Sequence, residues 1–147
     1  MNSYLARFTP QLLSILRIIA GFLFVEHGTQ KWLNFPGSRA TPTELMSMTG
    51  VTGSLELVGG TLLLLGLFTR PVAFVMSGFM AFAYFIAHAP QGFWPLLNRG
   101  ELAVLYCFVF LYFSAAGGGP WSLDAWLGQR KLADDVMARS RGAARAG

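Results

Sequence analysis

The segment PQLLSILRIIAGFLFVEHGTQ, residues 10–30, decides the fold class. A helix needs about 20 mainly apolar residues to cross a bilayer, and the only charged residue in this run before Glu26 is Arg17. The run is long and unbroken, and it lacks the alternation of apolar and polar residues that is typical of a membrane barrel strand. It therefore predicts a membrane-spanning helix, with Pro10 in its opening turn.

Three further apolar runs resemble the first one. They predict spans at about 51–69, 71–89 and 100–116. The sequence TRP at 69–71 is expected to form a tight turn, and GGGP at 117–120 is expected to end the last span. A short interfacial helix is expected at about 43–49, within the long first loop.

Composition agrees with a membrane protein. Hydrophobic residues make up 54% of the 147 residues and charged residues only 12%, whereas about a quarter of a soluble domain is charged. The predicted fold is all-α: one integral membrane four-helix bundle at 1–125. A basic tail follows at 126–147, and we expect it to be partly disordered.

The basic residues predict the orientation. An even number of spans places both termini on one side, which holds seven lysines and arginines against three on the other. The seven are Arg7, Arg70, Arg130, Lys131, Arg139, Arg141 and Arg145, and the three are Lys31, Arg39 and Arg99. Because the cytoplasmic side carries the excess of positive charge, both termini are predicted to be cytoplasmic.

Several classes of function are disfavoured by the sequence. The single cysteine, Cys107, excludes an internal disulfide, a dithiol pair and a metal site made only of cysteines. No nucleotide fingerprint is present, and the glycine-rich helix faces are typical of close helix packing. The basic tail favours contact with lipid headgroups over nucleic acid.

Polar residues from all four spans are predicted to gather in the outer layer of the membrane. They are Glu26, His27, Lys31, Glu56, His88, Asn98, Arg99 and Glu101. Helical phase refines this layer. It places Arg17, Gly21, Phe24, Gly28 and Lys31 on one face, with His27 at its edge and Glu26 nearly opposite. On the second span the shared face is Gly53, Glu56 and Gly60, and on the third it is Ser77, Ala81, Tyr84 and His88. On the fourth span it is Glu101, Leu105, Phe108 and Tyr112.

Arg17 lies two turns into the first span, where a charge is costly, so we expect it to face the bundle and find a partner. Three partners are open: Glu56 through a tilt or a water, backbone carbonyls, or the inner headgroups reached by snorkelling. Glu56 is the only acid away from the end of a predicted span, since Glu26 and Glu101 lie near span ends. This makes it the strongest candidate for a functional carboxylate.

The other candidates have simpler readings. Glu101 is favourable at a helix N-terminus whatever its function, and Lys31 is explained by interfacial solvation. His27 and His88 permit a bis-histidine haem or, with Glu56 and Glu101, a metal site. No local ligand motif supports these cofactors, so neutral, hydrogen-bonded histidines are favoured and no metal is assigned.

Four segments in order resemble the DoxX family of small four-helix bacterial membrane proteins. They are LRIIAGFLFVEHGTQKW, ELVGGTLLLLGLFTRP, NRGELAVLY and GGGPWSLD, which together extend from about Leu13 to Asp124. The resemblance implies a location in the bacterial inner membrane and a part in redox systems, as a subunit of a thiosulfate:quinone oxidoreductase or of a membrane oxidoreductase complex. The family's polar positions fall on Arg17, Lys31, Glu56, Asn98 and Glu101.

Three functions follow as alternatives. In the first, a redox-associated subunit binds a quinone or another small lipophilic molecule in the outer layer, where Glu56 or Glu101 handles protons and Arg17, His27, Lys31, Tyr84, His88 and Asn98 form the polar surroundings. In the second, the chain is a scaffold, anchor or assembly factor for partner oxidoreductase proteins, and its polar residues join the helices. In the third, a homo-oligomer transports a solute, although no inverted repeat or broken helix supports this.

Overall fold

The computed structural model describes residues 4–37 and 44–146, and every regular element within these ranges is helical. The long helices are α1 (Thr9–Leu33), α2 (Met48–Leu65), α3 (Thr69–Ala83), α5 (Glu101–Ala116) and α6 (Leu123–Ala146), and a 3-10 helix, η1 (Tyr4–Phe8), precedes α1. Between α3 and α5 lie the π-helix η2 (Tyr84–His88), the 3-10 helix η3 (Ala89–Gln91) and α4 (Pro95–Asn98). The all-α prediction is confirmed for these residues.

Three helical segments among the described residues are long and apolar enough to cross a membrane. They are Tyr4–Leu33, Met48–Leu65 and Thr69–Gln91, and Glu101–Ala116 is a shorter apolar helix. Since a helix rises 1.5 Å per residue, α5 is about 24 Å long, somewhat less than the ~30 Å hydrocarbon core.

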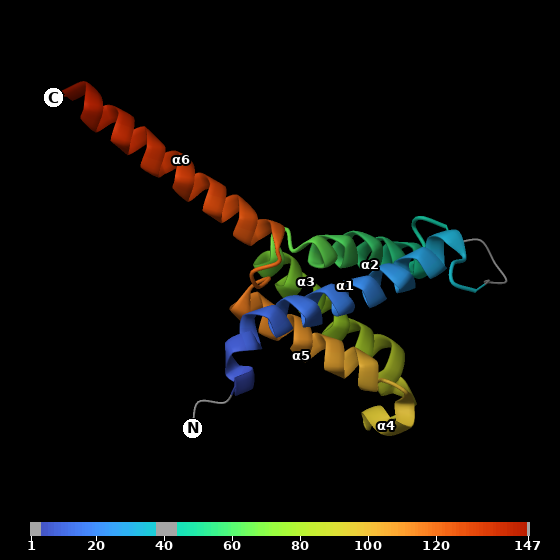
Figure 1. Cartoon of the computed structure of the whole chain (residues 1–147). Coiled ribbons are helices and arrows are strands. Elements are labelled where there is room, and N and C mark those ends of the chain that lie inside the picture. Colours follow the sequence, from blue (N-terminus) through green and yellow to red (C-terminus); the bar gives the residue numbers. More distant parts are fainter. Residues whose placement is uncertain (1–3, 38–43, 147) are drawn as a thin grey trace.

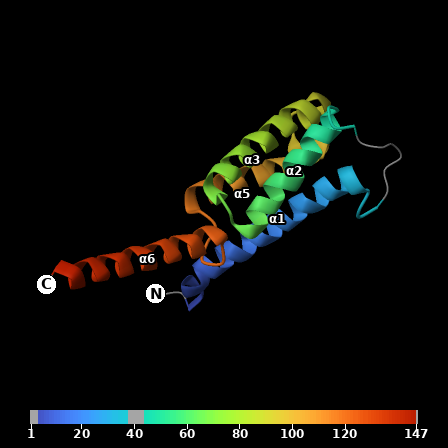
Figure 2. The same cartoon turned by 90° about the horizontal axis from the view of Figure 1, so that it is seen from above.

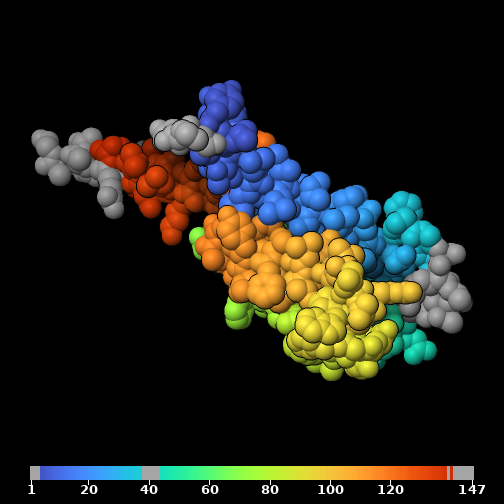
Figure 3. Space-filling model, turned by 90° about the horizontal axis from the view of Figure 1, so that it is seen from below, coloured from blue at the N-terminus to red at the C-terminus, as the bar shows by residue number. Residues whose placement is uncertain are grey.

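The four apolar helices lie side by side in two pairs. α1 packs along α2, and α3 packs along α5 (Figures 1 and 2). Helix α6 extends away from these helices in both views, from the end where α1 begins. The space-filling view shows α5 in orange beside α1 in blue, with the yellow segment around α4 at one end (Figure 3).

The outer surface of the paired helices is apolar. Phe22, Phe74 and Phe108 are 49%, 66% and 63% exposed, and many other large apolar side chains share this exposure. Soluble proteins rarely expose so continuous an apolar surface. In hydrocarbon the same surface is well solvated, so the fold suits a bilayer.

Glycines set the close packing of α1 on α2. A methyl group on Gly28 would lie 2.6 Å from the backbone nitrogen of Leu57, and one on Gly21 would lie 2.5 Å from that of Leu64. The backbones therefore approach where a Cβ does not fit, as is typical of helix pairs in membranes. The predicted inward faces of these two helices are largely confirmed: Lys31 is half-buried, and the other members are buried, namely Arg17, Gly21, Phe24, Gly28, Gly53, Glu56 and Gly60.

Replacing Gly28 with alanine is expected to destabilise the protein by roughly 1–3 kcal/mol, because the added methyl group pushes α1 away from rigid backbone in α2. The measurement is the apparent melting temperature of the purified protein in mild detergent. Gly78→Ala is the matched control, since a Cβ at Gly78 meets nothing within 4 Å; it is expected to be neutral or slightly stabilising, because alanine favours helix. Equal melting temperatures for the two variants would contradict the packing role.

The turn between α2 and α3 differs from the prediction. The structure places it at Gly66–Phe68, and the predicted TRP turn, 69–71, is the first turn of α3. Gly66 ends α2 in the left-handed conformation (φ 69°, ψ 41°). The Asp124 carboxylate accepts hydrogen bonds from the backbone N–H groups of Phe68 and Thr69, both at 2.8 Å. Asp124, in the first turn of α6, thus caps the N-terminus of α3 although it is more than 50 residues away in the sequence. Local sequence does not reveal this contact.

The predicted interfacial helix at 43–49 is replaced by the start of α2. Residues 44–47 are not helical, residues 48 and 49 are the first two of α2, and Ser47 caps this helix by accepting a hydrogen bond from Gly50 N at 3.1 Å. Residue 43 lies outside the described residues. Residues 126–146 are part of the helix α6, and the expected partial disorder of the segment 126–147 stays a prediction.

Candidate binding cavity

A cavity of about 420 Å³ lies where α1 ends, α2 begins, η2 ends and α5 begins. Polar side chains line one part of it: His27, Lys31, Thr49, Thr52, Glu56, His88, Arg99 and Tyr106. Apolar side chains line the remainder: Phe24, Met48, Phe79, Met80, Ala83, Ala87, Leu102 and Ala103. Polar groups in an apolar surround are typical of small-molecule sites.

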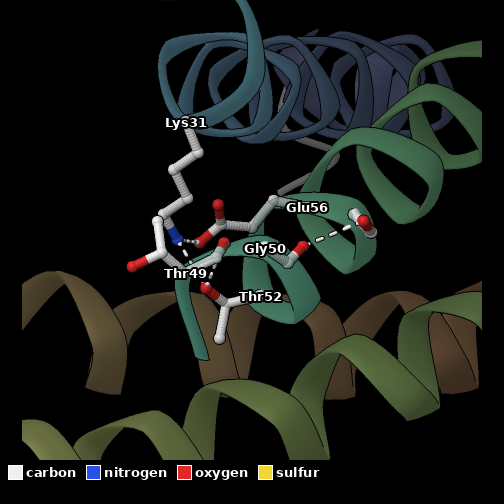
Figure 4. Close-up of polar contacts among 6 residues, drawn as sticks. Lys31, Thr49, Gly50, Thr52 and Glu56 are labelled. Atoms are coloured by element: carbon white, nitrogen blue, oxygen red, sulfur yellow. Dashed lines mark hydrogen bonds and ion pairs between the residues drawn. The ribbon is translucent and has the colours of Figure 1, made fainter. Parts of the chain in front are cut away.

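The ion pair between Lys31 and Glu56 is the most polar feature of the cavity wall. Lys31 Nζ donates to Glu56 Oε1 at 2.7 Å and to Thr52 Oγ1 at 3.1 Å (Figure 4). Glu56 is 9% exposed, and its second oxygen, Oε2, is buried without a hydrogen-bond partner. A buried acceptor with no donor is uncommon, and it marks this carboxylate for a functional explanation.

The side chain of Asn98 cross-links the chain between η2 and α5 by hydrogen bonds. It is 2% exposed, its Nδ2 donates to Gly92 O at 2.6 Å and Tyr84 Oη at 3.3 Å, and its Oδ1 accepts from Gly100 N at 2.8 Å. The Tyr84 hydroxyl in turn donates to the Phe93 carbonyl. Because all the polar atoms of the Asn98 side chain are engaged within the fold, its role is structural.

The π-helix η2 brings His88 to the cavity. A single π turn shifts the side chains that follow it, and such turns are frequent at functional sites. His88 Nδ1 lies 3.0 Å from the backbone carbonyl oxygen of Asn98, and its ring stacks on Tyr84 with centroids 6.3 Å apart. The same segment that Asn98 organises therefore holds the His88 ring in place.

Aromatic rings form the inner end of the cavity. Phe24 meets Tyr106 edge to face at a centroid distance of 4.9 Å, and Tyr106 stacks on Phe110 at 5.5 Å. Tyr106 is 9% exposed and belongs to the hydrophobic core. An aromatic surface next to polar groups suits a flat ring that carries polar substituents.

The structure brings four of the predicted site residues to one cavity: His27, Lys31, Glu56 and His88. Tyr84 and Asn98 do not line this cavity, and Tyr84 lines a second cavity that is described below. The expected contrast between Glu26 and His27 does not hold, because Glu26 is half-buried while His27 is exposed at the edge of the cavity. On the face that helical phase predicted for the third span, Ser77 and Tyr84 are buried, and Ala81 and His88 are half-buried.

Glu101 does not join Glu56. The predicted face of the fourth span, Glu101, Leu105, Phe108 and Tyr112, is exposed throughout, and Glu101 does not line the cavity. The buried face of α5 is Ala103, Tyr106, Phe110 and Phe113. Burying the larger aromatic area turns Glu101 outward at the first residue of the helix, where its charge suits the helix dipole.

Arg17 belongs to a separate cluster. It lies about 21 Å from Lys31 along α1, and its fully buried guanidinium donates to four carbonyls: Nη1 to Leu63 and Leu64 at 2.5 and 2.6 Å, Nε to Gly118 at 2.8 Å, and Nη2 to Trp121 at 2.6 Å. The sequence left three possible partners for Arg17, and the structure shows that backbone carbonyls are its partners. Arg17 is therefore not part of the polar layer to which it was assigned.

Sequence reasoning missed several wall residues. Thr52 and Thr49 carry no charge, and Tyr106 lies inside an apolar run. Arg99 was expected in the outer polar layer but not assigned to a site. The turn of α2 from Thr52 to Glu56, four residues apart on one face, is the one signal that could have found Thr52. Among the described residues, no three His, Cys, Asp or Glu side chains gather as a metal site requires.

Apolar helices of spanning length, an apolar outer surface and a polar cavity at one end define a helical membrane protein. The model of the DoxX family matches residues 12–89, and the chain belongs to this family. It is 45% identical over 132 residues to an uncharacterized protein of Haemophilus influenzae, covering 84% of this chain and 96% of the relative. It is 31% identical over 142 residues to an uncharacterized membrane protein of Mycobacterium tuberculosis, covering 84% and 86%. No solved structure matches the chain at a significant level.

Proposed function

We propose that the protein is a four-helix bundle of the bacterial inner membrane with both termini in the cytoplasm. The excess of lysine and arginine at the termini and at Arg70 supports this orientation. So does the start of α1 and of α6 at the same end of the helices (Figure 1). The cavity then lies in the outer half of the membrane.

In this bundle the cavity binds a quinone or a similar lipophilic ring, and the protein acts as a redox-associated subunit. The observation that supports the proposal is that two cavities lie next to each other and share lining residues of α3 and α5. A second cavity of about 410 Å³, lined by Phe85, Val104, Phe108 and other mainly apolar residues, shares Met80 and Ala103 with the polar cavity. A polar ring with a hydrocarbon tail matches this combination of a polar and an apolar space.

The residues of the chain have distinct tasks in this proposal. A quinone would supply the electron-accepting ring. Lys31 and Glu56 form an ion pair at 2.7 Å that leaves Glu56 Oε2 without a hydrogen-bond partner, and Phe24 and Tyr106 provide the aromatic surface. Glu56 and His88 can hold a proton near the ring, as proton-coupled chemistry requires. Glu101, which faces away, is not assigned to this task.

The test is to purify the protein in mild detergent and to analyse the extracted lipids by chromatography and visible spectroscopy. A quinone is expected at close to one molecule per binding cavity. Ala103→Leu is expected to lower its amount several-fold, because Ala103 is 4% exposed between the two cavities and the larger side chain fills that space. Ala115→Leu, at an exposed position on the same helix, is the matched control. A well-folded protein without any bound ring compound would refute the proposal.

A scaffold or assembly factor is the second candidate, and α6 favours it. Trp126, Leu132 and Val136 are 49%, 66% and 59% exposed on a helix that extends away from the others (Figure 2). This surface could receive partner oxidoreductase proteins or a second copy of the chain. Truncation after Gly128 separates the two functions: loss of co-purifying proteins with an unchanged ligand content supports scaffolding.

A further inference from the structure

Two groups at the cavity can act only as hydrogen-bond acceptors, and they deepen the proposed function by indicating the chemistry of the ligand. Two of the three donors of the Lys31 ammonium group are used by Glu56 and Thr52. Arg99 is exposed at the edge of the cavity, where solvent can satisfy its guanidinium. The Tyr106 hydroxyl can donate as well as accept, whereas the two groups described next only accept.

His88 offers one of these acceptors. Its Nδ1 lies 3.0 Å from the backbone carbonyl of Asn98, and a carbonyl oxygen can only accept. Nδ1 therefore carries the hydrogen, and in the neutral ring Nε2 is left with a lone pair. Because Asn98 O lies on the Nδ1 side, Nε2 is on the opposite side of a ring that lines the cavity.

Glu56 offers the other acceptor. Oε1 receives the Lys31 hydrogen bond, while Oε2 is buried and without a partner. Figure 4 shows one carboxylate oxygen beside the Lys31 nitrogen and the other turned away from it. A paired carboxylate accepts hydrogen bonds only, so rotation of this side chain toward a ligand would again present an acceptor.

We propose that the cavity selects an aromatic ring that carries a hydroxyl group, a phenol or quinol headgroup, over the same ring with acceptors only. His88 Nε2 receives the hydroxyl hydrogen, and Tyr106 and Phe24 contact the ring. For a quinone and quinol pair, this means that the reduced form binds more tightly. Ligands whose oxygen atoms lack a hydrogen leave the two acceptors unpaired.

The test measures equilibrium binding of 4-octylphenol and of its methyl ether to the full-length protein in mild detergent. Equilibrium dialysis against empty micelles corrects for partitioning into detergent. The phenol is expected to bind about tenfold more tightly, because a buried acceptor without a donor is unfavourable by about that factor or more. His88→Phe keeps an aromatic ring and removes the acceptor, so it is expected to bring the ratio close to one. His27→Phe tests the other histidine of the cavity as the acceptor; the ratio is expected to remain, because His27 is exposed at the cavity edge. Ala115→Leu, at an exposed position that lines neither cavity, is the matched control and is expected to leave the ratio unchanged.

Each outcome decides between the two proposals. Equal binding of phenol and ether to the wild-type protein overturns the preference for a hydroxyl group but leaves the lipophilic site standing. A tighter ether, or a ratio lost in His27→Phe and kept in His88→Phe, overturns the assignment to His88. If neither ligand binds and no ring compound co-purifies, the site itself is refuted. The wild-type ratio decides the preference even if His88→Phe does not fold.

Discussion

Arg17→Met is expected to leave little or no folded protein. The guanidinium is completely buried and donates to four backbone carbonyls, two at the C-terminal end of α2 and two in the 117–122 connection. Methionine fills a similar volume but donates nothing. Leu63 O still accepts a hydrogen bond from Gly66 N, whereas the carbonyls of Leu64, Gly118 and Trp121 lose the guanidinium donor. A buried unpaired group is unfavourable by about 1–3 kcal/mol, so the combined loss is a large part of the stability of a small protein, about 5–15 kcal/mol.

The measurement is the yield of monodisperse protein from detergent-solubilised membranes, followed by the apparent melting temperature of what remains. Arg17→Lys is expected to rescue only part of the loss, because a lysine ammonium has three donors and lacks the planar fork that reaches carbonyls on several sides. Arg70→Met is the matched control. Arg70 is exposed and donates to the carbonyls of Ser114 and Ala115, so its loss is expected to have a small effect. A wild-type yield of Arg17→Met would show that the cluster is dispensable.

The helix faces that sequence predicted correctly are those with a contrast between residue types. On α1 and α2, glycines and polar residues recur at helical spacing within apolar runs, and they mark the buried face because small residues allow close packing. The fourth span, ELAVLYCFVFLYFSAA, is apolar nearly all round after Glu101. Its hydrophobicity is the same on every side, so only the tertiary packing of Tyr106, Phe110 and Phe113 decides which face is buried.

The candidate site was partly predictable for a related reason. Depth in the membrane follows from counting residues along each span, and this counting brought Lys31, Glu56 and His88 to one level. The rotation of α5 does not follow from counting, so Tyr106 was missed and Glu101, which does not line the cavity, was expected beside Glu56. The partners of Arg17 depend on loop carbonyls, which no side-chain pattern encodes.

Lys31→Met is expected to destabilise the protein by about 3–5 kcal/mol, because it leaves the Glu56 carboxylate buried without its counter-charge. The reverse change, Glu56→Met, is expected to be milder. The Lys31 side chain is 21% exposed against 11% for Glu56, and a lysine near a helix end can extend its ammonium group to the membrane surface. The measurement is the apparent melting temperature of each variant in the same detergent.

The double variant Lys31→Met/Glu56→Met distinguishes an ion pair from two independent residues. Replacing both partners of a buried pair by apolar residues is often neutral or stabilising, so the double variant is expected to be more stable than Lys31→Met alone. Arg99→Met, which removes an exposed charge from the edge of the same cavity, controls for loss of charge at this depth and is expected to have little effect. If the losses from the two single variants simply add, Lys31 and Glu56 do not stabilise one another, and the ion pair would not be what holds the ends of α1 and α2 together at the cavity.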